Sequence, residues 1–312
     1  MLDIRDVFSN LLGLFLLIGV GYGAVRFGIL PAPTSKLFTR LLMNITLPAT
    51  VLTSLVQPYD PSFLSSGLLI VALGTFFYLL YGAICALLVR PLRVPEGKRG
   101  VWILACTFSN NGFMGFPISL ALFGEEGLVL AVFLGIPFNL LAYTLGPKLV
   151  CMDRAAAGNA PPLSWRFLLL TPVNVTTLLG LLLYGVQISI PGVLDAPFTY
   201  LSNVTTPLSM LIIGMNLTGG KLSSLLRDRD VFSASFLRLL LLPLLTWGVL
   251  RLLPLDAPLV VGVLVIIMAM PAAAVTSLLA ETYDANTEFA AELVFLSSLL
   301  CLATIPLISL LL

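Results

Sequence analysis

Histidine is absent from this 312-residue chain, and charged residues make up only 10% of it. The chain therefore lacks the commonest metal ligand and the side chain that most often carries protons near neutral pH. Its four cysteines lie far apart and form no Cys-x-x-Cys pair, so we expect buried, inert thiols and no metal site or disulfide framework. The chain also lacks paired acidic residues deep in an apolar segment. With no such pair and no histidine, an intramembrane enzyme is disfavoured.

Apolar side chains are present in excess. They make up 59% of the residues, and the mean hydropathy is +1.07, as expected for a polytopic membrane protein. The sixteen basic residues are spread between apolar segments, which leaves no basic face for a nucleic acid. Residues 1–6 lack a basic n-region, so we do not expect a cleaved signal peptide.

We predict an all-α fold with ten transmembrane helices, because ten apolar ranges are long enough to cross about 30 Å of hydrocarbon at 1.5 Å per residue. The predicted ranges are 7–28, 34–57, 62–90, 99–122, 126–151, 165–188, 194–217, 229–253, 257–282 and 287–312. The first contains Gly19 and Gly23, a spacing that permits close approach of another helix.

Basic residues alternate by side and predict the orientation. Thirteen of the sixteen fall in loops on one side, which the positive-inside rule makes cytoplasmic. The predicted location is the cytoplasmic membrane, with both termini outside. The thirteen residues are Arg26, Lys36, Arg40, Arg90, Arg93, Lys98, Arg99, Lys148, Arg154, Arg166, Lys221, Arg227 and Arg229.

The chain divides near its midpoint into two halves. Residues 1–151 form one set of five spans, residues 152–164 a polar cytoplasmic linker, and residues 165–312 a second set. Because five is odd, the halves must insert in opposite orientations, which predicts a 5+5 inverted repeat. Asn-x-Thr-x-Pro occurs at 44–48 and again at 203–207, and Pro117 has a counterpart in Pro271.

Two predicted spans are interrupted near their centres, at 106–117 and 270–277. Paired interruptions in corresponding positions of two halves point to a transporter's binding site. Half-helices that begin near Gly112 and near Pro271 and Ala272 would direct unpaired N–H groups at the gap and favour an anion. Further candidate ligands are Asn110 and Asn111, which could instead cap helix ends, and Thr276 and Ser277, which could instead bond their own helix.

Four further residues have open roles. Asn44 and Asn203 face the substrate or belong to self-satisfied kinks made by the prolines that follow them. Arg238 and Glu292 lie inside predicted spans, where an ionisable group suggests function and Glu292 suggests proton coupling. A snorkelling arginine or a static salt bridge would explain them equally well.

The motifs at 44–49, 109–117 and 270–273, with the ending at 302–307, resemble the auxin efflux carrier family over nearly the whole chain. The resemblance implies a fold like that of bile-acid symporters. Spans 1, 2, 6 and 7 would form a scaffold, and spans 3–5 and 8–10 a mobile transport domain in which the broken spans 4 and 9 cross. The chain lacks the long insert that plant auxin exporters carry between spans 5 and 6, which argues against auxin as the substrate.

The resemblance further implies a secondary transporter that moves a small organic anion, a mono- or dicarboxylate, by an elevator motion. The expected substrate site contains Ser109, Asn110, Asn111, Gly112, Pro117, Pro271, Ala272, Thr276, Ser277, Asn44 and Asn203. We expect no cofactor beyond a proton or sodium gradient, and a homodimer through the scaffold. A sodium-coupled symporter on the same fold is the alternative, because Ser109, Asn110 and Asn111 supply hard oxygen ligands. A cation/proton antiporter is disfavoured, since no aspartate lies at the centre of a span.

Overall fold

The structure, a computed structural model, describes residues 4–57, 60–152, 170–188, 190–219 and 228–312. The predicted linker 152–164 lies outside the described residues except for Met152. The described chain is helical and contains no strand apart from one isolated bridge between two residues. The all-α prediction is confirmed for this part of the chain.

Helical segments occupy each of the predicted ranges. The first half contains α1 (Ile4–Arg26), α2 (Thr34–Leu41), η1 (Leu42–Thr46), α3 (Leu47–Leu55), α4 (Pro61–Leu88), α5 (Arg99–Thr107), η2 (Asn111–Gly115) and α6 (Phe116–Val150). The second half contains α8 (Pro172–Val186), α9 (Gly192–Asn216), α11 (Arg229–Phe236), η4 (Leu237–Leu241), α12 (Leu242–Leu252), α13 (Pro258–Met268), α14 (Val275–Thr282) and α15 (Thr287–Ser309).

Five helical stretches in the described part of the chain are long and apolar enough to cross a membrane: 8–26, 63–88, 111–150, 229–252 and 287–309. The third joins two helical arms, because Gly124 takes a positive φ of 68° and interrupts the helix between the predicted fourth and fifth spans. Pro172–Val186 and Pro258–Met268 are shorter apolar helices. The lengths and composition are those of a multi-pass membrane protein.

Three π-helical turns, η1, η2 and η4, each end two residues before a proline, at Pro48, Pro117 and Pro243. Proline lacks the N–H that an α-helix needs, and its ring clashes with the carbonyl four residues earlier. Widening the preceding turn by one residue relieves this clash while the chain stays helical. The sequence thus bends its helices at defined positions without breaking them.

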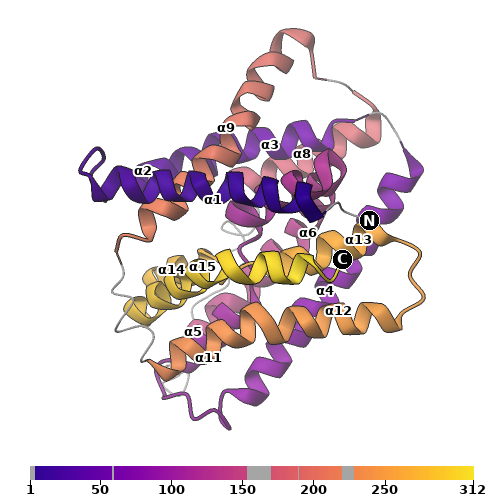
Figure 1. The fold of residues 1–312 in the computed structure, drawn as a ribbon. Coiled ribbons are helices and arrows are strands. Elements are labelled where there is room, and N and C mark those ends of the chain that lie inside the picture. Colours follow the sequence, from indigo (N-terminus) through magenta and orange to yellow (C-terminus); the bar gives the residue numbers. More distant parts are fainter. Residues whose placement is uncertain (1–3, 58–59, 153–169, 189, 220–227) are drawn as a thin grey trace.

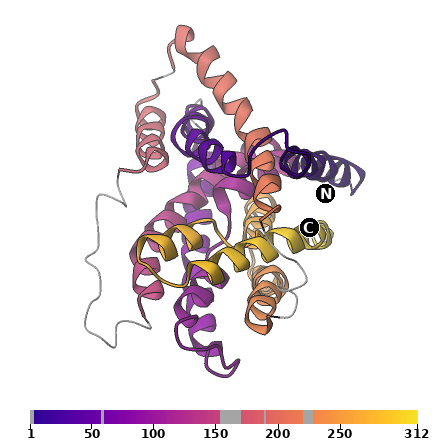
Figure 2. The same cartoon turned by 90° about the vertical axis from the view of Figure 1, so that its left-hand side faces the viewer.

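The helices pack in two groups. In the upper part of Figure 1, α1 packs along α9, and α3 packs against α8 and α9. In the lower part, α4 contacts α5 and α6, α13 contacts α6 and α12, and α15 contacts α11 and α14. The start of α1 and the end of α15 lie close together in both views (Figures 1 and 2).

The closest approach of α1 to α9 uses a glycine that the sequence pattern does not single out. A Cβ at Gly21 would overlap the Leu211 carbonyl, and one at Gly214 of α9 would overlap the Ile18 carbonyl. Among the described residues, a Cβ at Gly19 would have no neighbouring atom within 4 Å, and one at Gly23 would meet only the ring of Phe27, just after α1. The close approach that we expected is present, but it lies on another face of α1.

Candidate functional site

The two interrupted segments lie against each other. The Asn110 N–H donates to the Pro271 carbonyl at 2.9 Å, and the Ala273 N–H donates to the Phe108 carbonyl at 3.0 Å. Ser109 lies between these two bonds and is completely buried. Backbone groups that left their helices thus satisfy each other, as they must in an apolar interior. The sequence prediction that both spans break is confirmed.

Asn110 and Asn111 have different surroundings, although they are adjacent. The Asn110 Oδ1 accepts a hydrogen bond from the Phe113 N–H at 3.3 Å and so caps η2, which confirms the capping interpretation for this residue. Asn111 is 2% exposed, and its Nδ2 reaches only the Ala131 carbonyl, at 3.5 Å. Its Oδ1 has no hydrogen-bond partner within the described part of the chain. Of the two adjacent amides, Asn111 is therefore the one whose side-chain oxygen the fold does not use.

The second half-helix begins later than we expected. It starts at Val275, not at Pro271 and Ala272, because the intervening residues are drawn into the paired segments. The Ala272 N–H already donates to the Ser297 Oγ of α15 at 3.1 Å. The N–H of Ala272 is consequently not free for a carboxylate.

Thr276 contributes a second unpartnered polar atom. Its side chain is fully buried, and its Oγ1 finds no hydrogen-bond partner among the residues that the structure describes, so it does not bond the carbonyl four residues earlier. Ser277 beside it is half-buried. Gly112 lies where a Cβ would contact the Leu47 side chain of α3, and Pro117 is buried at the start of α6.

Asn44 and Asn203 lie on the exposed surface, whereas the side chains of the paired segments are buried. The Asn44 Nδ2 donates to the Arg40 carbonyl one helical turn earlier, at 2.7 Å, so the Asn44 amide is hydrogen-bonded within its own helical segment. Asn203 belongs to α9, which continues through Pro207 as one helix.

Arg238 reaches the centre of the site. The residue is 1% exposed, and its guanidinium donates to four carbonyls at or just after the ends of α5 and α13. Snorkelling is therefore wrong for Arg238, because carbonyls released at the helix breaks supply the acceptors that water would otherwise supply. Among the described residues, no ion pair joins Arg238 to Glu292. Glu292 is half-buried near the start of α15.

Three side chains that contact the paired segments or Arg238 were not predicted from the sequence. The Tyr78 hydroxyl lies 3.1 Å from the Ser109 Oγ, and the Tyr81 ring lies 5.7 Å from the Arg238 Cζ. Ser297 accepts from Ala272, as described above. Tyr78 and Tyr81 lie three residues apart in an apolar helix. A buried tyrosine usually needs a hydrogen-bond partner, which is the signal that could have indicated them.

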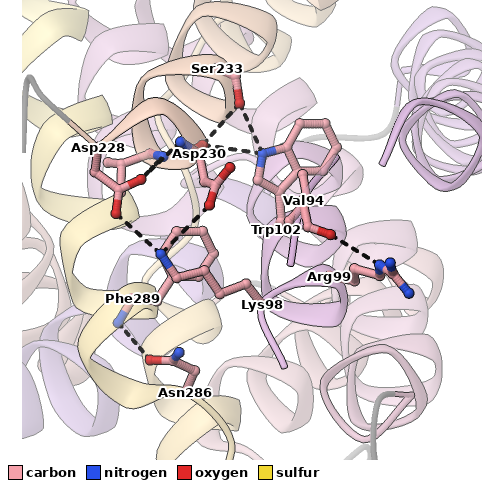
Figure 3. Close-up of polar contacts among 10 residues, drawn as sticks. Val94, Lys98, Arg99, Trp102, Asp228, Asp230, Ser233, Asn286 and Phe289 are labelled. Carbon is pink, nitrogen blue, oxygen red and sulfur yellow. Dashed lines mark hydrogen bonds and ion pairs between the residues drawn. The ribbon is translucent and has the colours of Figure 1, made fainter. Parts of the chain in front are cut away.

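A charged cluster joins the starts of α5, α11 and α15 (Figure 3). The Lys98 Nζ lies 3.1 Å from Asp228 and 3.6 Å from Asp230, and 4.5 Å from the centre of the Phe289 ring. Burial acts to raise the pKa of Asp228, but hydrogen bonds from Lys98 and from two backbone N–H groups outweigh it and lower the pKa. The cluster anchors three helices that converge on the paired segments.

Comparison with known proteins points to one family. A family described as "Membrane transport protein" matches residues 6–309. The chain is 29% identical over 301 residues to an uncharacterised transporter of Methanothermobacter thermautotrophicus, covering 96% of each chain. It is 26% identical over 310 residues to an uncharacterised transporter of Methanocaldococcus jannaschii, covering 94% of each. It is 22% identical over 246 residues to the uncharacterised transporter YfdV of Escherichia coli K12, covering 76% of each.

Proposed function

The chain belongs to the membrane transport protein family, and on that premise we propose that it is a secondary transporter for a small organic anion, a mono- or dicarboxylate. The observation that carries the proposal is the buried pairing of two broken helices beside two unpartnered polar atoms, Asn111 Oδ1 and Thr276 Oγ1. Buried polar atoms normally have partners. A substrate that enters the gap would supply them.

Charge at the gap favours an anion. Helix α6, with its first turn η2, and helix α14 both begin beside the paired segments. The start of a helix carries about half a positive charge, so the two starts together favour about one negative charge. The Asn111 amide adds a donor that can turn from its weak contact with Ala131 toward a carboxylate.

An elevator motion is the mechanism we propose. The group formed by α1, α2, α3, α8 and α9 would be the scaffold and homodimer surface, and the group that contains the paired segments would move against it. The close α1–α9 contact at Gly21 and Gly214 supports a rigid scaffold. We propose ten crossings with both termini outside the cytoplasmic membrane. The start of α1 and the end of α15 lie close together (Figure 1), and this proximity supports an even number of crossings.

A sodium-coupled symporter is the second candidate, and the observation that favours it is the unpartnered Asn111 Oδ1. An amide oxygen is a suitable ligand for a hard cation. The other two predicted ligands are less available. The Ser109 hydroxyl lies within hydrogen-bond distance of Tyr78, and the Asn110 Oδ1 caps η2. Within the described residues, Asn111 Oδ1 is thus the one side-chain oxygen of the predicted set that has no partner.

The decisive experiment is a thermal-shift screen of the purified protein against mono- and dicarboxylates, amino acids and indole acids, followed by uptake of any hit into proteoliposomes. A ligand at 100 times its dissociation constant should stabilise the protein by about 2.7 kcal/mol. The proposal is refuted if no carboxylate shifts the transition and none is taken up.

A further inference from the structure

Arg238 is a buried cation that pairs with no acidic side chain in the described part of the chain. The residue is 1% exposed, and the ion pairs among the described residues involve only Lys98 and Arg99 as cations. An unpaired charge in the interior is costly, so some other group must compensate it. The nearest groups are backbone carbonyls.

These carbonyls belong to two helix ends. The Arg238 Nη1 donates to Cys106 at 3.1 Å and to Thr107 at 3.4 Å, at the end of α5. The Nη2 donates to Met268 at 3.0 Å, the last residue of α13, and the Nε donates to Met270 at 3.0 Å. The end of a helix carries about half a negative charge, so two ends supply about the one charge that balances a guanidinium.

The balance between the Arg238 charge and the two helix ends bears on whether sodium can bind here as a coupling ion. Two helix ends that converge in an apolar interior attract a cation, and their carbonyls are oxygen ligands of the kind that a hard cation accepts. In this chain the guanidinium of η4 already takes four of those carbonyls. A sodium ion close by would meet the repulsion of a fixed positive charge at short range.

We propose that Arg238 supplies, as a permanent part of the chain, the positive charge that sodium would otherwise bring, so that the organic anion binds and crosses without sodium. The inference rests on the proposed function. It assigns Arg238 a positioning role: the guanidinium holds the ends of α5 and α13 together, and it leaves the positive starts of α6 and α14 free for the substrate. On this inference, sodium does not bind at Ser109, Asn110 and Asn111, because Ser109 and Asn110 already have partners and the fixed charge of Arg238 takes the place of the ion.

The test compares wild type with Arg238→Ala, using the carboxylate identified in the thermal-shift screen. Affinity and uptake are measured in about 0.1 M sodium chloride or choline chloride, which keeps screening equal. We expect the wild-type affinity to be the same in both salts. In Arg238→Ala we expect the affinity to fall by about tenfold or more in choline, the effect of losing interactions with one charged group, and to recover when sodium or millimolar guanidinium is added.

Two variants serve as controls. Arg251→Gln removes an exposed arginine that lies over Trp247 on α12, and it should change neither affinity nor salt dependence. Arg238→Lys keeps the charge with fewer donors, and it should remain independent of sodium even if it is less stable. A merely structural arginine would lower stability in Arg238→Ala without creating any dependence on a cation.

The outcomes separate the two proposals. If the wild-type affinity for the carboxylate rises with sodium, the inference is overturned and the proposed function stands. Sodium dependence of the affinity in Arg238→Lys would have the same two consequences. Failure of both cations to rescue Arg238→Ala also overturns it. If Arg238→Ala does not fold, the wild-type and lysine measurements decide. A wild type that binds and transports no carboxylate in either salt refutes the proposed function, and the inference fails with it.

Discussion

Replacing Asn111 tests the candidate site most directly, because this side chain does little for the fold. It is 2% exposed, its Nδ2 makes one long hydrogen bond of 3.5 Å, and its Oδ1 has no partner among the described residues. In Asn111→Ala, relief of the unpaired acceptor offsets part of the lost packing. We therefore expect the free energy of unfolding to change by no more than about 1 kcal/mol. The effect should appear in binding instead.

If the Asn111 amide donates to a substrate carboxylate, Asn111→Ala should lose about 1.5–3 kcal/mol of binding free energy, which is about tenfold to a hundredfold in affinity. Asn111→Asp should be worse, since an acceptor replaces the donor and a like charge faces the ligand. The assay is a titration of the carboxylate found in the thermal-shift screen, with stability measured on the same samples.

Asn139→Ala is the matched control. It removes a 2.7 Å amide–amide bond between α6 and α8, so it should lower stability by about 0.5–1.5 kcal/mol and leave affinity unchanged. Wild-type affinity in both Asn111 variants would remove this residue from the site. An affinity that is higher in Asn111→Asp than in Asn111→Ala, and that needs sodium, would indicate a cation ligand and contradict the donor role.

Three further predictions concern packing, topology and pH. Gly214→Ala should lower stability by about 1–3 kcal/mol, because its Cβ would overlap a backbone oxygen of α1, whereas Gly19→Ala should be neutral; equal melting temperatures would contradict the close contact. Cysteines at the exposed positions Glu96 and Asp195 should react with an impermeant reagent from opposite sides of the membrane, and labelling from one side would end the ten-crossing proposal. The folded-state pKa of Asp228 is depressed, so its stabilising effect is present above about pH 4 and is lost as the pH falls through the folded value. Melting temperatures should therefore drop on the acid side, and Asp228→Asn should flatten that drop; an unchanged slope would contradict it.

Much of the fold follows from the sequence. An excess of apolar residues with few charges determines a membrane protein, since such a chain cannot cover itself with polar surface in water. Two glycines, adjacent amides and a proline in one apolar segment determine that the helix breaks between Thr107 and Asn111. These are local effects of backbone freedom and missing N–H donors, so neighbouring residues suffice to predict them.

The partners of the buried polar groups were decided only by the tertiary structure. Arg238 binds backbone carbonyls, and every residue carries a carbonyl, so no pattern in the sequence marks which ones it will meet. Ala272 gives its N–H to Ser297, a residue 25 positions away, and this long-range bond helps to delay the second half-helix to Val275. Asn111 and Asn110 have the same side chain, yet only the packed fold leaves one of them with an unpartnered oxygen. Sequence chemistry thus determined where the helices break, and three-dimensional packing decided which polar atoms at the break are left without a partner in the described part of the chain.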